Sequence, residues 1–244
     1  MAGAVEVALA NGCVTATLNF GDARAILDET MAASLLEVFE QVEDDDDIRM
    51  LAITGSGANF CRGFERNCDA RLVESLAVIS KPTVAIINGF AIDEGLELAM
   101  AADIRIALGA ARLAMTQLNR GELPRFGGTQ RLPRLAGAAN ALRMMLTSDS
   151  IDGNEAARIG LVSYLANGHV QLAQISAQVA QAIISRAPVA ARLVKDAVLK
   201  GYDMTLDQGI RLEEDLYALL QTTADRAEGV RAFLEKRKPL FRGA

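Results

Sequence analysis

The chain of 244 residues has no tryptophan, one histidine and three cysteines. Cys13, Cys61 and Cys68 are an odd number and show neither a CxxC pair nor the Cys/His spacing of a zinc site. This pattern disfavours a disulfide scaffold and a metal centre, so we expect no metal and a reducing compartment. His169 follows Asn167-Gly168, a pair typical of turns, and is expected to lie in a surface loop.

Positive charge and long apolar runs are also scarce. With 25 Lys and Arg against 31 Asp and Glu, the net charge is −6, which disfavours a nucleic-acid-binding surface. The most apolar segment, 72–92, is interrupted by Glu74, Lys81-Pro82 and Asn88-Gly89. It therefore predicts two buried segments and no membrane span. The N-terminus lacks the basic start and apolar run of a signal peptide, so we expect a cytoplasmic protein.

A hydrophobic content of 51% allows one substantial core, which predicts a single domain with an appendage. Alternating apolar residues on both sides of Asn11-Gly12 predict a hairpin between Val5 and Leu18. Apolar residues at helical spacing predict a helix over 28–43, capped by Asp28. The chain is thus expected to open with a hairpin followed by an amphipathic helix.

Short apolar runs alternate with helical stretches in the middle of the chain. The runs predict buried strands at 50–54, 83–88, 104–108 and 161–166. Helices are predicted between some of these strands, at 69–79 and 94–102. This alternation is typical of the α/β class. The four aspartates at 44–47 could bind calcium, but they lack the glycine and terminal glutamate of a calcium loop, which favours a solvated connection.

The pattern after residue 169 is helical almost to the end of the chain. Breaks at Pro188, at Gly201-Tyr202-Asp203 and in "TTAD" divide it into helices at 170–185, 188–200, 205–220 and 224–236. We therefore divide the chain into a core at 1–168 and a helical C-terminal region at 169–244.

The stretch "GSGANFCRGFER" at 55–66 directly follows a predicted strand. Its glycines show neither the GxGxxG order nor the lysine of a phosphate-binding loop, so they fit nucleotide binding poorly. A tight strand-to-loop turn explains them. Such a turn can also direct one backbone N–H outward, and Phe64, after Gly63, is the candidate.

The stretch "NGFAIDEGLELAMAADIR" places three carboxylates at the start of an apolar helix. Asp93 and Glu94 are interpreted as helix caps or partners of the helix dipole. Glu97 lies one turn further, where burial would raise its pKa toward the range of a general base or acid. An ion pair with an arginine is an equally good explanation, and the candidates are Arg62, Arg105 and Arg125.

Four ordered segments resemble signatures of the crotonase superfamily, the enoyl-CoA hydratases and isomerases. They are "GANFCRGF", "KPTVAIINGFAIDEGLELAMAADIRIA", "GELPRFGGTQRLPRLAG" and "EGVRAFLEKRKPLF". The resemblance runs nearly end to end. It implies a spiral of ββα units with a C-terminal helical oligomerisation region that forms homotrimers or hexamers.

Carried over position by position, the resemblance gives the backbone N–H groups of Phe64 and Glu94 the role of an oxyanion hole for a thioester carbonyl. Glu97 matches the first of two glutamates that related hydratases use, one to activate water and one to protonate Cα. The second glutamate falls on Gln117, and an amide cannot give up a proton at neutral pH. The segment 65–80, which walls the acyl pocket in the usual hydratases, is shorter here.

The resemblance also implies substrate-binding residues. "DARAILD" at 22–28 matches an early CoA-contacting segment, which points to Ala23 and Arg24. Cys61 and Arg62 lie in the turn before Phe64. Arg62 either contacts a CoA phosphate or forms a surface pair. Near the C-terminus, Phe233 and Lys236 resemble family positions that reach the CoA of a neighbouring subunit. Helix packing and solvation also explain these two residues without a function.

We therefore expect an enzyme acting on acyl-CoA or acyl carrier protein thioesters, with coenzyme A as part of the substrate and no separate cofactor. The expected reaction is enoyl-CoA hydration or the reverse dehydration through a stabilised enolate. Gln117 leaves two alternatives open, an isomerase or decarboxylase with a single carboxylate and a non-catalytic CoA-binding scaffold. The dehalogenase-like branch is disfavoured because it needs a histidine and a tryptophan.

Overall fold

A computed structural model describes residues 3–244. The chain opens with the predicted hairpin, in which β1 (Ala4–Ala10) pairs antiparallel with β2 (Cys13–Asn19). Asn11 and Gly12 both have positive φ angles, 52° and 83°. This is the backbone that a two-residue hairpin turn requires, which is why Asn-Gly is favoured there.

The hairpin forms the edge of a six-stranded sheet with the order β1-β2-β4-β7-β9-β12, in which all pairs after the hairpin are parallel. The predicted central strands are confirmed within one residue as β4 (Met50–Gly55), β7 (Thr83–Ile87) and β9 (Ile104–Leu108). The fourth prediction was too long, since β12 covers only Tyr164–Ala166. Leu161 and Val162 are buried in the preceding turn, where both N–H groups bond to Ala156 O, so their apolar character reflects burial without strand pairing.

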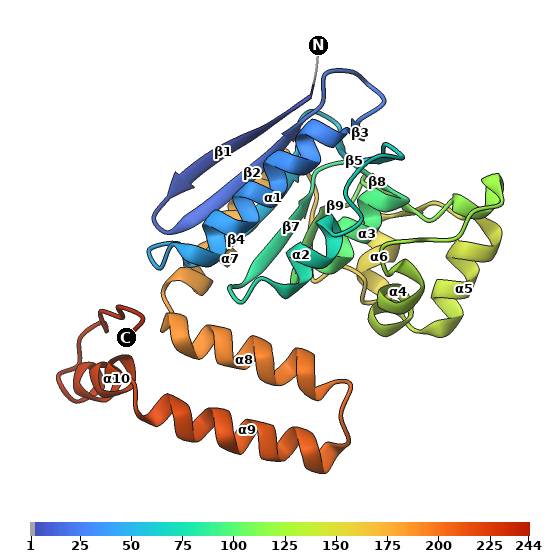
Figure 1. The fold of residues 1–244 in the computed structure, drawn as a ribbon. Coiled ribbons are helices and arrows are strands. Elements are labelled where there is room, and N and C mark those ends of the chain that lie inside the picture. Colours follow the sequence, from blue (N-terminus) through green and yellow to red (C-terminus); the bar gives the residue numbers. More distant parts are fainter. Residues whose placement is uncertain (1–2) are drawn as a thin grey trace.

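Each long parallel strand is followed by a short strand that belongs to a second layer. The short strands are β3 (Ile26–Leu27), β5 (Asn59–Cys61), β6 (Gly63–Phe64), β8 (Phe90–Ile92), β10 (Arg112–Ala114) and β11 (Ile151–Asp152). They form a four-stranded sheet, β11-β10-β8-β5, and a separate β3-β6 pair. Helices α2 (Leu72–Val78) and α3 (Glu94–Ala101) complete two successive ββα units, which establishes the expected spiral (Figure 1).

The remaining core helices are α1 (Glu29–Asp44), α4 (Gly128–Ala136), α5 (Ala138–Thr147) and α6 (Gly153–Arg158), with a short 3-10 helix, η1, at Gln117–Arg120. The predicted cap of α1 is confirmed, because Asp28 Oδ1 accepts a hydrogen bond of 2.8 Å from Met31 N. Of the four aspartates at 44–47, Asp44 ends α1 and Asp45 is half-buried, while Asp46 and Asp47 are exposed as expected for a solvated connection.

Four helices end the chain: α7 (His169–Ile184), α8 (Pro188–Gly201), α9 (Leu206–Gln221) and α10 (Ala224–Leu234). Helix α7 packs on β9 and β12 and buries Leu172 and Val179. By contrast, none of the residues of α8 and α9 is fully buried within this chain, and the pair extends away from the sheets (Figure 1). The division at 168/169 stays a prediction. Within residues 3–244, no helix is long and apolar enough to cross a membrane.

Candidate active site

A cleft of about 770 Å³ opens where β6, the start of α3 and the segment after η1 meet. Phe64 and Glu94, the two predicted backbone donors, both line it. Gly95 brings these elements together, because a Cβ atom at this position would lie 2.1 Å from Cys61 O. Only glycine therefore permits α3 to approach β5 this closely. The approach brings the first residue of α3 beside the turn that carries Phe64.

Both backbone positions suit an oxyanion site. Glu94 is the first residue of α3, so its N–H has no acceptor within the helix and lies at the positive end of the helix dipole. Phe64 follows Gly63, whose φ of 148° is unfavourable for residues with a side chain. The turn and the helix start thus face the same cleft.

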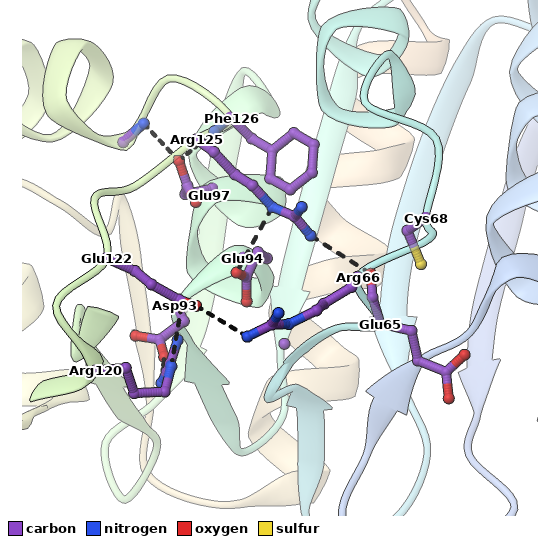
Figure 2. A network of polar contacts seen from close by, with 12 residues as sticks. Glu65, Arg66, Cys68, Asp93, Glu94, Glu97, Arg120, Glu122, Arg125 and Phe126 are labelled. Carbon is purple, nitrogen blue, oxygen red and sulfur yellow. Dashed lines mark hydrogen bonds and ion pairs between the residues drawn. The ribbon is translucent and has the colours of Figure 1, made fainter. Parts of the chain in front are cut away.

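Glu97 is fully buried, and its two carboxylate oxygens differ in their surroundings. Oε1 accepts hydrogen bonds from Phe126 N at 2.8 Å and from Gly128 N at 2.7 Å (Figure 2). Oε2 has no hydrogen-bond partner among the described residues. Burial raises the pKa of Glu97 and the charge of Glu94 raises it further, against the lowering effect of the two backbone N–H groups.

The ion-pair explanation of Glu97 was wrong. Arg105 instead donates to the backbone carbonyls of Leu161 and Ala102, and Arg62 lies over the ring of Phe90 at 4.6 Å. Arg125 approaches Glu94, with 4.0 Å between its Nε and Glu94 Oε1. Two backbone N–H groups therefore hold Glu97 in place of a cation, which leaves its pKa elevated.

Gln117 is 1% exposed and begins η1. Neither its Oε1 nor its Nε2 has a hydrogen-bond partner within residues 3–244. Only four buried side-chain polar atoms in this part of the chain lack a partner, and three of them belong to Glu97 and Gln117. Because an unpaired buried polar atom is costly, such atoms mark a site for a polar ligand.

Asp93 occupies the N-cap position of α3, as expected, but its side chain makes no capping hydrogen bond. Its carboxylate instead accepts hydrogen bonds from Thr116 N, from Thr116 Oγ1 at 2.9 Å and from Arg120 Nη1 at 3.0 Å. Asp93 also has a φ of 49°, unusual for a residue with a side chain. This contact ties the start of α3 to η1, and therefore Glu94 to Gln117.

Sequence reasoning named Arg125 only as a possible partner of Glu97, and it did not predict the ion pairs around these groups. Arg66 and Glu122 form an ion pair of 3.5 Å at the rim of the cleft, and Glu122 also pairs with Arg120 at 3.1 Å (Figure 2). Arg125 lines both this cleft and a second cavity of about 720 Å³ between α2, α4 and α8. Phe126 packs its ring on Phe64, with 5.4 Å between the centroids. The arginines at 120 and 125 were the signal in the sequence that ion pairs form here, but the sequence does not show which carboxylates on other elements they contact.

The predicted substrate-binding residues are not all at the cleft. Arg62 lines it, whereas Ala23 and Arg24 lie in the exposed loop before β3, where Arg24 pairs with Asp22 at 2.7 Å. Cys61 is buried, and its thiol donates to Gly63 O at 3.3 Å. Burial raises the pKa of this thiol to about 12, and Cys61 does not line the cleft, so its predicted substrate contact is not found there.

Phe233 and Lys236 lie at the end of α10 and just beyond it, on the opposite side of the molecule from α3 (Figure 1). Phe233 is 81% exposed. Neither residue reaches this chain's own cleft, so any contact with CoA would have to be made in another subunit. No group of three or more potential metal ligands occurs among residues 3–244.

Comparisons with known proteins agree with this geometry. The family model described as enoyl-CoA hydratase/isomerase matches residues 9–244. The chain is 36% identical to (E)-benzylidenesuccinyl-CoA hydratase of Thauera aromatica, over 98% of this chain and 99% of that protein. It is 38% identical to crotonyl-CoA hydratase of Syntrophomonas wolfei, with coverages of 85% and 87%. The crystal structure of an enoyl-CoA hydratase from Bacillus anthracis superposes with a TM-score of 0.94 at 31% identity, covering 98% of this chain and 99% of that one.

Proposed function

This chain belongs to the enoyl-CoA hydratase/isomerase family, whose members act on acyl-CoA thioesters, and we propose that it hydrates a 2-enoyl thioester or catalyses the reverse dehydration. The observation that carries the proposal is the Glu97 carboxylate, which is buried, not paired with a cation and without a hydrogen-bond partner at Oε2 among the described residues. A carboxylate in this state is suited to remove a proton from water.

In the proposed reaction the thioester oxygen accepts hydrogen bonds from Phe64 N–H and Glu94 N–H. These donors stabilise the negative charge that develops on the oxygen as the enolate forms. The Glu94 N–H contributes through the positive end of α3 as well as through its hydrogen bond. The oxyanion site is thus made of backbone and does not depend on side-chain identity.

Glu97 removes a proton from water while the water oxygen forms a bond to Cβ. The π electrons of the Cα–Cβ bond move toward C1, and the thioester oxygen takes the negative charge. Phe126 N–H and Gly128 N–H hold Oε1, so Oε2 is the oxygen that faces the reacting water. Protonation of Cα then regenerates the thioester carbonyl and completes the 3-hydroxyacyl product.

Gln117 orients water or substrate through its amide in this scheme, since it cannot exchange a proton at neutral pH. The same oxyanion site with one carboxylate also supports isomerisation or decarboxylation, and a scaffold would bind CoA without turnover. Saturated, 2-enoyl, 3-enoyl and malonyl-type CoA thioesters assayed side by side separate these reactions. Calorimetry with CoA identifies a scaffold, which binds without converting any of them.

Replacing Gln117 with glutamate is expected to raise the rate of crotonyl-CoA hydration. The change restores an ionisable group with little change in volume, and general acid catalysis contributes about 10²–10⁴-fold when fully engaged. The rate constant kcat for the variant and the wild type, measured with crotonyl-CoA, tests this. An unchanged or lower rate with intact binding would mean that the native reaction needs no proton donor at position 117, and would favour isomerisation or decarboxylation over hydration.

The group that carries the acyl chain as a thioester is proposed to be coenzyme A or the prosthetic arm of an acyl carrier protein. Arginines at the cleft, among them Arg62, are suited to phosphate groups of either carrier. Comparing a CoA thioester with the same acyl group on a carrier protein distinguishes the two.

We expect a homotrimer or a dimer of trimers, because α8 and α9 bury no residues in this chain while exposing large apolar side chains. Val194, Leu206 and Tyr217 are between 63% and 78% exposed. Exposed apolar surface of this kind marks an interface. Light scattering at micromolar concentration measures the mass, and a monomer of 26.0 kDa would contradict both the oligomer and a neighbour's CoA contact from Lys236.

A further inference from the structure

Hydration requires a proton for Cα that Gln117 cannot give. We propose that the side chain of Glu94 exchanges this proton, so that Glu94 acts twice, through its backbone N–H at the thioester oxygen and through its carboxyl group at Cα. This inference rests on the proposed hydratase function, which it deepens by naming a second catalytic carboxylate.

The other carboxylates of the cleft are already engaged. The cleft is lined by three acidic residues, Asp93, Glu94 and Glu122. Asp93 accepts hydrogen bonds from Thr116 and Arg120 on both oxygens and is 3% exposed, so both oxygens are taken up by structural contacts. Glu122 pairs with Arg66 and Arg120 at the rim. Glu94 has the weakest contact of the three, an ion pair with 4.0 Å between its Oε1 and Arg125 Nε.

Glu94 is partly accessible and points into the cleft. Its side chain is 12% exposed and accepts no hydrogen bond from the described residues. Its Oε2 lies 3.1 Å from where a Cβ atom on Gly63 would be, which places it beside the turn that presents Phe64 N–H. The carboxyl group therefore lies close to the position where the two donors would hold the thioester, and Cα is two bonds from that oxygen.

Glu94 and Glu97 are three positions apart on α3, so their side chains lie on the same face. The charge of Glu94 is one of the causes that raise the pKa of Glu97. The other groups that face Glu94 are Arg125, at 4.0 Å, and the buried thiol of Cys61.

The proton balance closes with these two residues. For the proposed step, Glu97 must start ionised and Glu94 must start protonated. Glu97 takes a proton from water as the oxygen bonds to Cβ, and Glu94 gives its proton to Cα as the enolate electrons form the Cα–H bond. Glu97 ends protonated and Glu94 ionised, and exchange with solvent through the cleft restores the starting form. The net reaction is the addition of one water.

The variant Glu94→Gln tests the side chain while keeping the backbone N–H. We expect kcat for crotonyl-CoA hydration to fall by about 10²-fold or more, with thioester affinity within a few-fold of wild type, since general acid catalysis contributes about 10²–10⁴-fold. Glu29→Gln, which removes an exposed carboxylate from the first position of α1, is the matched control and should leave kcat unchanged.

Two readouts separate proton transfer from loss of structure. With butyryl-CoA in D₂O, the wild type and Glu97→Gln should exchange the Cα hydrogen for deuterium, whereas Glu94→Gln should not. The double variant with Glu94→Gln and Gln117→Glu should hydrate crotonyl-CoA faster than the single variant Glu94→Gln. This increase in kcat should be larger than the increase that Gln117→Glu causes in the wild type. Wild-type rates in Glu94→Gln, or lost hydration with normal Cα exchange, would overturn the assignment while leaving the hydratase function intact. Absence of hydration by the wild type with every 2-enoyl thioester would overturn both.

Discussion

Replacing Glu97 with glutamine is expected to lower hydration of a 2-enoyl thioester by about 10²–10⁴-fold or more, because the amide cannot accept a proton from water. Binding should stay within a few-fold of wild type. The glutamine carbonyl can still accept the hydrogen bonds that Phe126 N and Gly128 N donate to Oε1, so the loop before α4 keeps its support. The measurements are kcat with crotonyl-CoA and calorimetry with the thioester.

The pH dependence of the wild type gives an independent check on Glu97. A general base must be ionised, so activity falls as pH decreases through its pKa. Burial raises the pKa of Glu97 above its ordinary value of 4.5, so the acidic limb of the kcat profile should lie above the usual glutamate range. Substantial activity in Glu97→Gln, or an acidic limb at an ordinary glutamate value, would show that Glu97 is a structural residue.

Replacing Phe64 with proline removes one of the two backbone donors. Loss of a single oxyanion donor typically lowers the rate by about 10²–10³-fold, and we expect a loss of that size in kcat for Phe64→Pro. Phe64→Ala keeps the N–H and should be much milder, although it removes the ring that packs on Phe126.

The comparison of these two variants is the decisive part of the experiment. Circular dichroism and the thermal unfolding midpoint establish that each variant is folded, since proline also restricts the φ angle. Near-normal turnover by a folded Phe64→Pro protein would remove Phe64 N–H from the oxyanion site. An equal loss in both variants would assign the effect to packing of the ring.

Patterns local in the chain were sufficient for much of the fold. The hairpin follows from Asn11-Gly12, whose positive φ angles are available to these residues at small cost, and the cap of α1 follows from Asp28. The longer parallel strands follow from continuous apolar runs, because both of their faces are buried. The two- and three-residue strands of the second layer were not predicted, since so few residues show no period.

The candidate site also combines features that the local sequence predicts with features that depend on the tertiary structure. The sequence by itself determined which groups are available: a glutamate at 97, a glutamine at 117, and a turn and a helix start that present N–H groups. Only the tertiary structure decided their states. Burial raises the pKa of Glu97, and the backbone N–H groups of Phe126 and Gly128, 29 and 31 positions away, hold its carboxylate without an arginine. Asp93 is removed from the chemistry by Thr116 and Arg120, and Glu94 is left facing the cleft. Local preferences act over one or two turns of chain, whereas burial and pairing of a charge depend on elements that only folding brings together.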